Sequence, residues 1–198
     1  MISADRFIAS KSLDEAAWLE ARRLGVSATT IAKAMTPAGY LEVVNSWHDE
    51  TPVPVNPYMA FGLESERWLA GWAKSQFGTM PNDWLIRHAD NPIAYATPDG
   101  LSLDHTVITE IKTTGKDWGS VDKIPIQYKR QVAWQLYVTG AEYCIFIWML
   151  REEHDGVMVP AWLEPKSGVI VRDDVTINKM VEVAGKLWAK IGGQNGEV

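Results

Sequence analysis

Apolar positions recur at helical spacing in several stretches of the chain, and turn-forming residues mark the end of each stretch. The first stretch begins at Ser12, has Glu15 three residues later in the arrangement of a capping box, and stops at Gly25. A second, shorter stretch has Ser27 or Thr29 as its N-cap and must end by Pro37. Further helices are predicted over residues 61–77, 127–139 and 173–192.

Short runs rich in β-branched and aromatic residues predict strands between these helices. The runs lie at residues 84–89, 93–100, 106–114 and 142–150. We predict that they form one sheet, with the helix at 127–139 between the third and fourth strands and the helix at 173–192 as a cover for the sheet. The chain is then a single α/β domain spanning residues 1–198, with a frayed polar tail at about 192–198.

Glu66 stands out in the predicted helix at 61–77. At 100° per residue it falls at the centre of an arc of apolar side chains. A carboxylate aimed into an apolar stripe is costly to ionise unless a cation or metal meets it, so Glu66 is a candidate metal ligand or base. The apolar side chains of this arc are Leu63, Leu69, Ala70, Ala73 and Phe77.

The strand at 106–114 carries two opposite charges on one face. Side chains alternate across a strand, so Glu110 and Lys112 point to one side and Ile111 to the other. Asp99, just before the Gly100 turn, can lie beside them in a hairpin. The two carboxylates and a backbone carbonyl make a hard oxygen site for Mg²⁺ or Mn²⁺. An exposed Glu–Lys pair is common, and the Pro–Asp pair upstream is what makes this pattern specific.

Composition limits the chemistry further. The single cysteine, Cys144, lies in an apolar run and cannot form an intramolecular disulfide, and the four histidines lack ligand spacing. Any metal is therefore expected to have oxygen ligands. No apolar run approaches a membrane span, and no secretory signal is visible, so a cytoplasmic protein without a membrane partner is expected. The net charge of −6 argues weakly against nucleic acid, although it does not describe a local site.

The turn between the first two predicted helices brings hydroxyls and free backbone N–H groups beside Arg22 and Arg23. Such groups can bind a phosphate. A capped helix with solvated arginines is the alternative, and these residues alone favour it.

Four stretches of the sequence together resemble a known family. "ARRLGVSATTI", "NPYMAFGLESE", "YATPDGLSLDHTVITEIKTT" and "IPIQYKRQVAWQLYVTGAEYCIFI" are similar, in this order, to motifs of the YqaJ-like phage recombinase exonucleases, the lambda exonuclease family of PD-(D/E)XK nucleases. The resemblance implies a nuclease core with a central mixed β-sheet flanked by α-helices. It also implies a Mg²⁺-dependent enzyme, with Mn²⁺ as a substitute, that degrades one strand of linear double-stranded DNA from the 5′ end. A ring-shaped homotrimer, a single-strand annealing partner and a phage or prophage origin in a bacterial host follow from the same resemblance.

The resemblance also assigns roles to individual residues. Asp99, Glu110, the Ile111 carbonyl and Glu66 would hold metal, and Lys112 would be the catalytic lysine. Gln131 would match the motif glutamine. Arg23 would bind the terminal 5′-phosphate, with the hydroxyl contact left open among Ser27, Thr29 and Thr30.

Two alternatives remain on the sequence alone. One is an endonuclease or single-strand nuclease on the same catalytic core. The other is a DNA-binding or assembly module without activity, which the intact Asp99, Glu110 and Lys112 disfavour. The role of Arg130 stays open. Trp118, in the polar loop after the lysine, is the tryptophan expected to contact bases or a neighbouring subunit.

Overall fold

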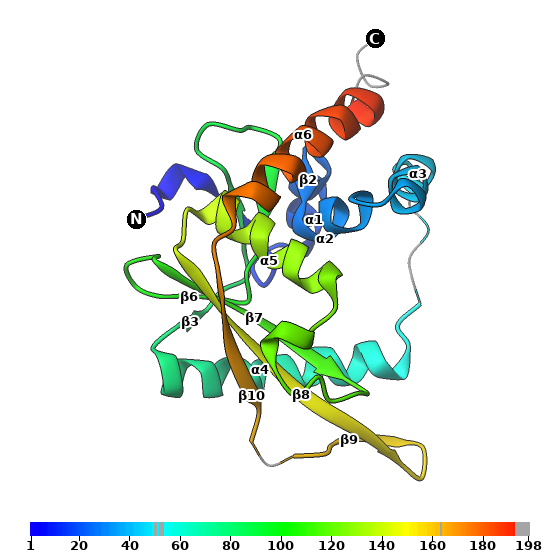
Figure 1. Ribbon diagram of the computed structural model, residues 1–198, viewed down its shortest axis with the longest axis vertical. Helices are drawn as coiled ribbons and strands as arrows, with labels where there is room; N and C mark the ends of the chain where they lie inside the picture. The colour runs from blue at the N-terminus through cyan, green and yellow to red at the C-terminus, as the bar shows by residue number, and fades with distance from the viewer. Residues whose placement is uncertain (50, 52–53, 163, 193–198) are drawn as a thin grey trace.

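The computed structural model describes residues 1–49, 51, 54–162 and 164–192 (Figure 1). The predicted tail therefore lies outside the described residues, apart from residue 192. The helices are α1 (Glu15–Arg23), α2 (Ala28–Ala34), α3 (Pro37–Ser46), α4 (Pro57–Phe77), α5 (Ile126–Thr139) and α6 (Asp174–Ile191), with short 3₁₀ turns at Ala4–Arg6 and Val121–Lys123. The strands are β1 (Phe7–Ser10), β2 (Val26–Ser27), β3 (Met80–Pro81), β4 (Trp84–Arg87), β5 (Ala94–Ala96), β6 (Gly100–Leu101), β7 (Val107–Thr114), β8 (Tyr143–His154), β9 (Val157–Pro160) and β10 (Lys166–Val171).

The strands form two sheets, which corrects the expectation of a single one. The larger sheet has the order β10-β8-β7-β6-β3, with β9 paired to β8, and the smaller has the order β1-β4-β5-β2. The predicted strand at 93–100 is split between them, because Thr97, Pro98 and Asp99 interrupt it and proline has no N–H for a ladder. Both sheets are mixed: β7 and β8 run parallel, and so do β2 and β5. The mixed α/β architecture is confirmed.

The parallel pair β7 and β8 lies between two helices. Leu69, Ala70 and Ala73 of α4 pack on Ile111 and on a row of alternate β8 side chains. The opposite row of β8 packs with the buried side chains of α5, which lies on the other side of the sheet from α4. Figure 1 shows β7 and β8 passing between α4 and α5. A parallel connection needs a crossover of this kind, and α5 supplies it between β7 and β8. The β8 row that faces α4 is Ile145, Ile147 and Met149, and the row that faces α5 is Cys144, Phe146 and Trp148.

The C-terminal helix does not cover the sheet as predicted. The side chains of α6 with helical spacing are buried, but α6 packs on α2, α3 and α5, so it forms an outer layer over helices (Figure 1). Its apolar stripe correctly predicted burial without indicating what it packs against. No helix among the described residues is long and apolar enough to cross a membrane.

Several helix boundaries differ from the prediction. The N-cap of α1 is Asp14, whose Oδ1 accepts a hydrogen bond from the Ala17 N–H at 2.9 Å. Ser12 lies three residues before the first residue of α1, and its Oγ pairs with Ser10 Oγ at 3.2 Å, so it does not cap the helix. Ser27, one of the two candidates, is the N-cap of α2.

The prolines mark helix starts that the sequence reading missed. Pro37 is the first residue of α3, with Thr36 as its N-cap, and Pro57 is the first residue of α4, with Asn56 as its N-cap. Proline favours this position because the first N–H of a helix has no partner in any case. By contrast, α5 ends at Gly140, as predicted, and that residue has the left-handed conformation that glycine tolerates.

Trp118 does not project from its loop. It is half-buried and packs against Tyr128, Phe146 and Trp148, with ring centroids 5.6–6.2 Å apart. Within the chain, Trp118 packs the start of the β7–α5 connection. Its contact with bases or with a neighbouring subunit stays a prediction.

Candidate active site

Asp99 and β7 meet where the β6–β7 pairing ends. The Asp99 N–H donates to the Thr109 carbonyl at 3.0 Å, and Asp99 Oδ2 accepts a hydrogen bond from the Ile111 N–H at 2.6 Å. The carboxylate thus continues the ladder that the short strand β6 leaves unfinished. In a strand, the N–H and C=O of one residue point the same way, so the Ile111 carbonyl also faces the Asp99 side. This geometry brings Asp99, Glu110 and the Ile111 carbonyl together.

Glu110 is buried, with 1% of its surface exposed, and both of its carboxylate oxygens have partners. Oε1 accepts hydrogen bonds from Gln131 Nε2 at 2.8 Å and from the Lys112 ammonium. Oε2 accepts one from Gln135 Nε2 at 2.6 Å. The predicted shared face of Glu110 and Lys112 is confirmed, and it is the face toward α5. Such complete pairing is what a buried carboxylate requires.

Gln135 is the functional residue that sequence reasoning did not assign. It lies one helical turn after Gln131 on α5, so both amides reach the same carboxylate. The four-residue spacing of two glutamines on one helix face was the signal that could have identified it. Its own Oε1 is buried without a hydrogen-bond partner.

The charges around this site perturb the pKa values of its members. Burial, and next the negative charge of Glu110, raise the pKa of the Asp99 carboxyl well above its usual value. Burial alone would lower the pKa of Lys112, but the charges of Glu110 and Asp99 raise it above that of an ordinary lysine. Lys112 is therefore a fixed ammonium group at neutral pH. The site holds more negative than positive charge, which is an environment that favours a bound cation.

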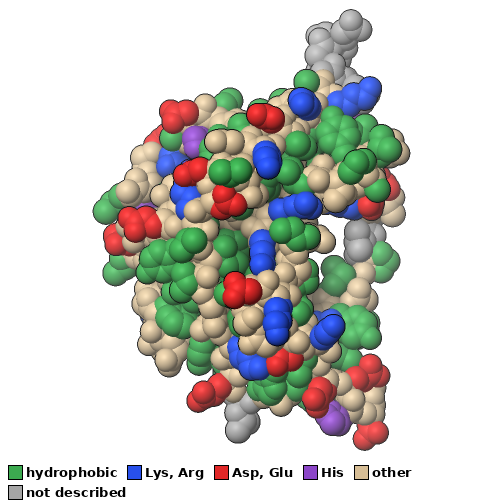
Figure 2. Space-filling model, in the orientation of Figure 1, with side chains coloured by type: hydrophobic (Ala, Val, Ile, Leu, Met, Phe, Trp, Pro, Cys, Tyr) green, Lys and Arg blue, Asp and Glu red, His purple; other side chains and the backbone are tan. Residues whose placement is uncertain are grey.

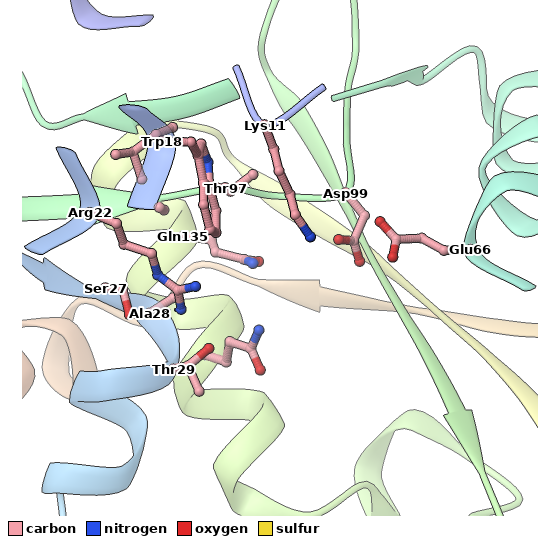
Figure 3. Close-up of a pocket in the computed structure, with 13 residues that line it drawn as sticks. Lys11, Trp18, Arg22, Ser27, Ala28, Thr29, Glu66, Thr97, Asp99 and Gln135 are labelled. Atoms are coloured by element: carbon pink, nitrogen blue, oxygen red, sulfur yellow. Dashed lines mark hydrogen bonds between the residues drawn. The ribbon is translucent and has the colours of Figure 1, made fainter. Parts of the chain in front are cut away.

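Glu66 reaches the site from α4, although not in the predicted way. Leu69, Ala70 and Ala73 are buried as expected, but Leu63 is 55% exposed and Glu66 itself is exposed. The apolar arc is narrower than predicted because only part of this long helix packs on the sheet. Glu66 instead faces a cleft, where its carboxylate and that of Asp99 point toward each other (Figure 3).

The cleft ends in a pocket of about 170 Å³ that is lined by carboxylates at one side and by an arginine and hydroxyl groups at the other (Figure 3). Arg22 enters it with its guanidinium 5.0 Å from the centre of the Trp18 ring, and its Nη2 donates to Ser27 Oγ at 3.3 Å. Burial lowers the pKa of Arg22 from its usual value. Among the residues that line the pocket are Arg22, Ser27, Thr29, Glu66, Asp99, Gln131 and Gln135.

Arg23 does not share this pocket. It is exposed and lines a separate hollow with Thr30 and Trp47, although Arg22 and Ser27 border both spaces. Of the three candidate hydroxyl residues, Ser27 and Thr29 line the pocket that holds Asp99, and Thr30 lines only the other hollow. The arginine that the geometry places with the carboxylates is Arg22, one residue before the one that the resemblance indicated.

The donor set suits a hard divalent cation by its chemistry. The donors are oxygens: Asp99 and Glu66 line the pocket, and the buried Glu110 and the Ile111 carbonyl lie close to Asp99. Within the described ranges, no group of three or more His, Cys, Asp or Glu side chains is drawn together in a ready metal cluster. Burial raises the pKa of Asp99 most, and the negative charges of Glu110 and Glu66 raise it further, so a cation bound there would relieve the repulsion between these carboxylates. The residues therefore fit a metal such as Mg²⁺.

Comparison with known proteins agrees with this geometry. The alkaline exonuclease LHK-Exo from Laribacter hongkongensis has a similar structure, with a TM-score of 0.71 and 24% identity over 89% of this chain and 92% of that one. Its complex with dAMP is similar at a TM-score of 0.67 and 25% identity, over 88% of this chain and 91% of that one. A phage-related exonuclease from Haemophilus somnus 129PT has a TM-score of 0.66 and 14% identity, over 85% and 93%.

No curated protein sequence matches the chain. A family model does match it, over residues 17–142, which include every residue that lines the 170 Å³ pocket except Lys11. This match covers more than half of the chain and contains Arg22, Glu66, Asp99, Glu110 and Lys112. The chain belongs to the family of the YqaJ-like viral recombinase domain and is a nuclease of the phage exonuclease type.

Proposed function

We propose that this nuclease is a Mg²⁺-dependent exonuclease that degrades one strand of linear double-stranded DNA in the 5′-to-3′ direction. The observation that carries the proposal is the single pocket that holds Arg22 and Ser27 at one side and Asp99 and Glu66 at the other. A cationic hydrogen-bonding group beside metal-binding carboxylates suits a DNA end with a terminal phosphate. An endonuclease has no use for a terminal-phosphate pocket next to its catalytic carboxylates.

Each residue has a distinct task in this proposal. Asp99, Glu110, the Ile111 carbonyl and Glu66 would hold Mg²⁺, which acts as a Lewis acid on a phosphoryl oxygen when it is bound. Lys112 supplies a fixed positive charge to the scissile phosphate as negative charge develops. Gln131 and Gln135 hold the Glu110 carboxylate in one orientation through its two oxygens.

Arg22 is the residue that we assign to the terminal 5′-phosphate, with Ser27 and Thr29 as hydroxyl partners. Its guanidinium can donate to two phosphate oxygens at once, which suits end recognition. Water then attacks the next phosphorus along the strand, and the bond to the 3′ oxygen of the terminal nucleotide breaks. The products are a nucleoside 5′-monophosphate and a strand with a new 5′-phosphate, which can bind in the same pocket. A relative bound to dAMP contains a nucleotide of this class.

Charge distribution supports a DNA substrate despite the net charge of −6. On the face in Figure 2, Lys and Arg side chains form a band down the middle of the molecule, and many of the Asp and Glu side chains lie toward its edges. We include in the proposal the ring-shaped homotrimer, a single-strand annealing protein as partner, and action in the bacterial cytoplasm during phage recombination.

The test compares three DNA substrates with wild-type enzyme and Lys112→Ala in Mg²⁺. The substrates are linear duplex with 5′-phosphate ends, the same duplex with 5′-hydroxyl ends, and a closed circle. The proposal expects lysine-dependent release of mononucleotides from linear DNA, faster from 5′-phosphate ends, and an intact circle. Cutting of the circle would instead establish an endonuclease, and binding without any cutting would establish an inactive DNA-binding module.

A further inference from the structure

Lys11 occupies a central position in the cleft that neither the sequence motifs nor the family assignments explain. It lies in the loop between β1 and α1, outside the residues that the family model matches. Its side chain borders all three hollows of the cleft. The first contains Arg22 and Asp99, the second Arg67 and Asp83, and the third Lys112 and Arg151. Figure 3 shows its side chain extending into the pocket in the direction of Asp99 and Glu66.

The loop that carries Lys11 is held in place by Asp83, which precedes β4. The Lys11 N–H donates to the Asp83 carbonyl at 3.2 Å. On either side, Ser10 Oγ and the Ser12 N–H donate to Asp83 Oδ2 at 2.9 Å and 2.7 Å. Burial alone would raise the pKa of Asp83, but these hydrogen bonds lower it, so the carboxylate remains an ionised acceptor. Three hydrogen bonds therefore fix the backbone from which Lys11 enters the cleft.

The ammonium group of Lys11 is not committed to a structural partner. Its ion pair is with Glu15 Oε1 at 3.7 Å, between side chains that are 43% and 64% exposed. It lies 5.7 Å from the centre of the Trp18 ring. A solvent-exposed ion pair at this distance adds little stability. The ion pair with Glu15 and the approach to the Trp18 ring both leave the ammonium group open to the cleft. A fixed backbone with an available charge is the arrangement of a residue that binds an anionic ligand.

We propose that Lys11 binds a backbone phosphate of the DNA strand being degraded, between the terminal-phosphate pocket at Arg22 and the carboxylates Asp99 and Glu66. This inference rests on the proposed function. Lys11 would draw the strand across the carboxylates, which otherwise repel it. The contact recognises the phosphate charge and not the base, so it acts equally on every sequence.

The experiment measures DNA binding separately from cleavage. All variants carry Lys112→Ala so that the DNA stays intact in Mg²⁺, and fluorescence anisotropy with a 5′-phosphorylated duplex gives the binding constant over a range of salt concentrations. Lys11→Met removes the charge and keeps the length of the side chain, whereas Lys11→Arg keeps the charge. Lys33→Met is the matched control, because Lys33 has a similar exposure of 39% and its own carboxylate partner, Glu42, but lines none of the three hollows.

Each phosphate contact contributes about 0.9 to the slope of log K against log salt for duplex DNA. Lys11→Met is therefore expected to reduce this slope by about 0.9. If the two proteins bind equally when extrapolated to 1 M salt, the variant binds about eightfold more weakly than its parent at 0.1 M salt. Lys11→Arg and Lys33→Met are expected to keep the slope. An unchanged slope in Lys11→Met, or an equal loss in Lys33→Met, would overturn the inference.

Two controls separate this inference from the function on which it rests. Wild-type enzyme that leaves linear DNA intact would refute the exonuclease, while the binding slopes would still decide the role of Lys11. An active wild type with an unaltered slope in Lys11→Met would refute the role of Lys11 alone. A circular dichroism melt of each variant shows whether a loss of binding comes from unfolding. If Lys11→Met is unfolded, the result for Lys11→Arg is used instead. A folded Lys11→Arg keeps the positive charge, so a reduced salt slope in that variant would contradict phosphate binding by Lys11.

Discussion

Gln135→Leu tests whether the two α5 glutamines hold the buried Glu110 carboxylate. The substitution removes the 2.6 Å hydrogen bond from Gln135 Nε2 to Glu110 Oε2 and leaves the 2.8 Å bond from Gln131 in place. A hydrogen bond to a charged group stabilises a protein by about 1.5–3 kcal/mol. Leucine has a similar size, so the cavity that remains is small.

The stability change measured for Gln135→Leu alone underestimates the strength of the hydrogen bond between Gln135 and Glu110. Gln135 Oε1 is buried without a partner, and an unpaired buried acceptor costs about 1–3 kcal/mol, which Gln135→Leu recovers. The two effects oppose each other, so we expect the free energy of unfolding to fall by less than about 2 kcal/mol. A double-mutant cycle with Glu110→Met isolates the bond, because the recovered cost is the same in both backgrounds.

The cycle predicts a coupling energy of about 1.5–3 kcal/mol between Gln135 and Glu110. Urea unfolding of the wild type, both single variants and the double variant measures it, with equal m-values as the condition for comparison. Independent sites are additive to within about 0.5 kcal/mol, so a coupling below that value would refute the reasoning. Tyr40→Phe, a half-buried ring on α3 away from the cleft, serves as the control and should show no coupling to Glu110→Met.

Three further predictions have defined outcomes. Arg22→Ala is expected to abolish the preference for 5′-phosphate over 5′-hydroxyl ends in a competition assay, whereas Arg23→Ala keeps it; the reverse result would restore Arg23 as the phosphate ligand. Glu66→Gln is expected to lower the rate at limiting Mg²⁺ and to recover at saturating Mg²⁺, and wild-type rates throughout would remove Glu66 from the metal site. Gly25→Ala is expected to lower the free energy of unfolding by about 1–3 kcal/mol, measured by urea unfolding. A Cβ at this position would lie 2.3 Å from the Tyr95 ring and 2.4 Å from the Ile93 carbonyl oxygen. A stability equal to that of the wild type would contradict this contact.

The part of the site that the sequence predicted depends on local geometry. A strand alternates its side chains strictly, so Glu110 and Lys112 had to share a face wherever the strand was placed. Asp99 is close to them because a short hairpin leaves it no other position. The helix at 127–139 was also predictable, since the glycine at position 140 ends it by backbone conformation alone.

The rest depends on how elements pack, which a periodic pattern does not contain. Glu66 lies on the predicted face of α4, but its exposure is decided by how far that helix extends beyond the sheet. Whether Arg22 or Arg23 enters the pocket depends on the rotation of α1 against Trp18, a matter of one residue. Pro37 predicts a helix end but is also the first residue of α3, because a proline excludes a preceding helix as strongly as it favours a following one.

The electrostatics of the cleft favour one role for Lys112 over another. As a general base it would have to be neutral, but Glu110 and Asp99 raise its pKa, so the ammonium persists at neutral pH and is lost only as the pH rises through the raised value. The raised pKa of Lys112 therefore adds stability that is present at all lower pH values and is lost as the pH rises through the raised value. We therefore expect Lys112 to act as a positive charge toward the phosphate and the proton of the attacking water to go to another acceptor.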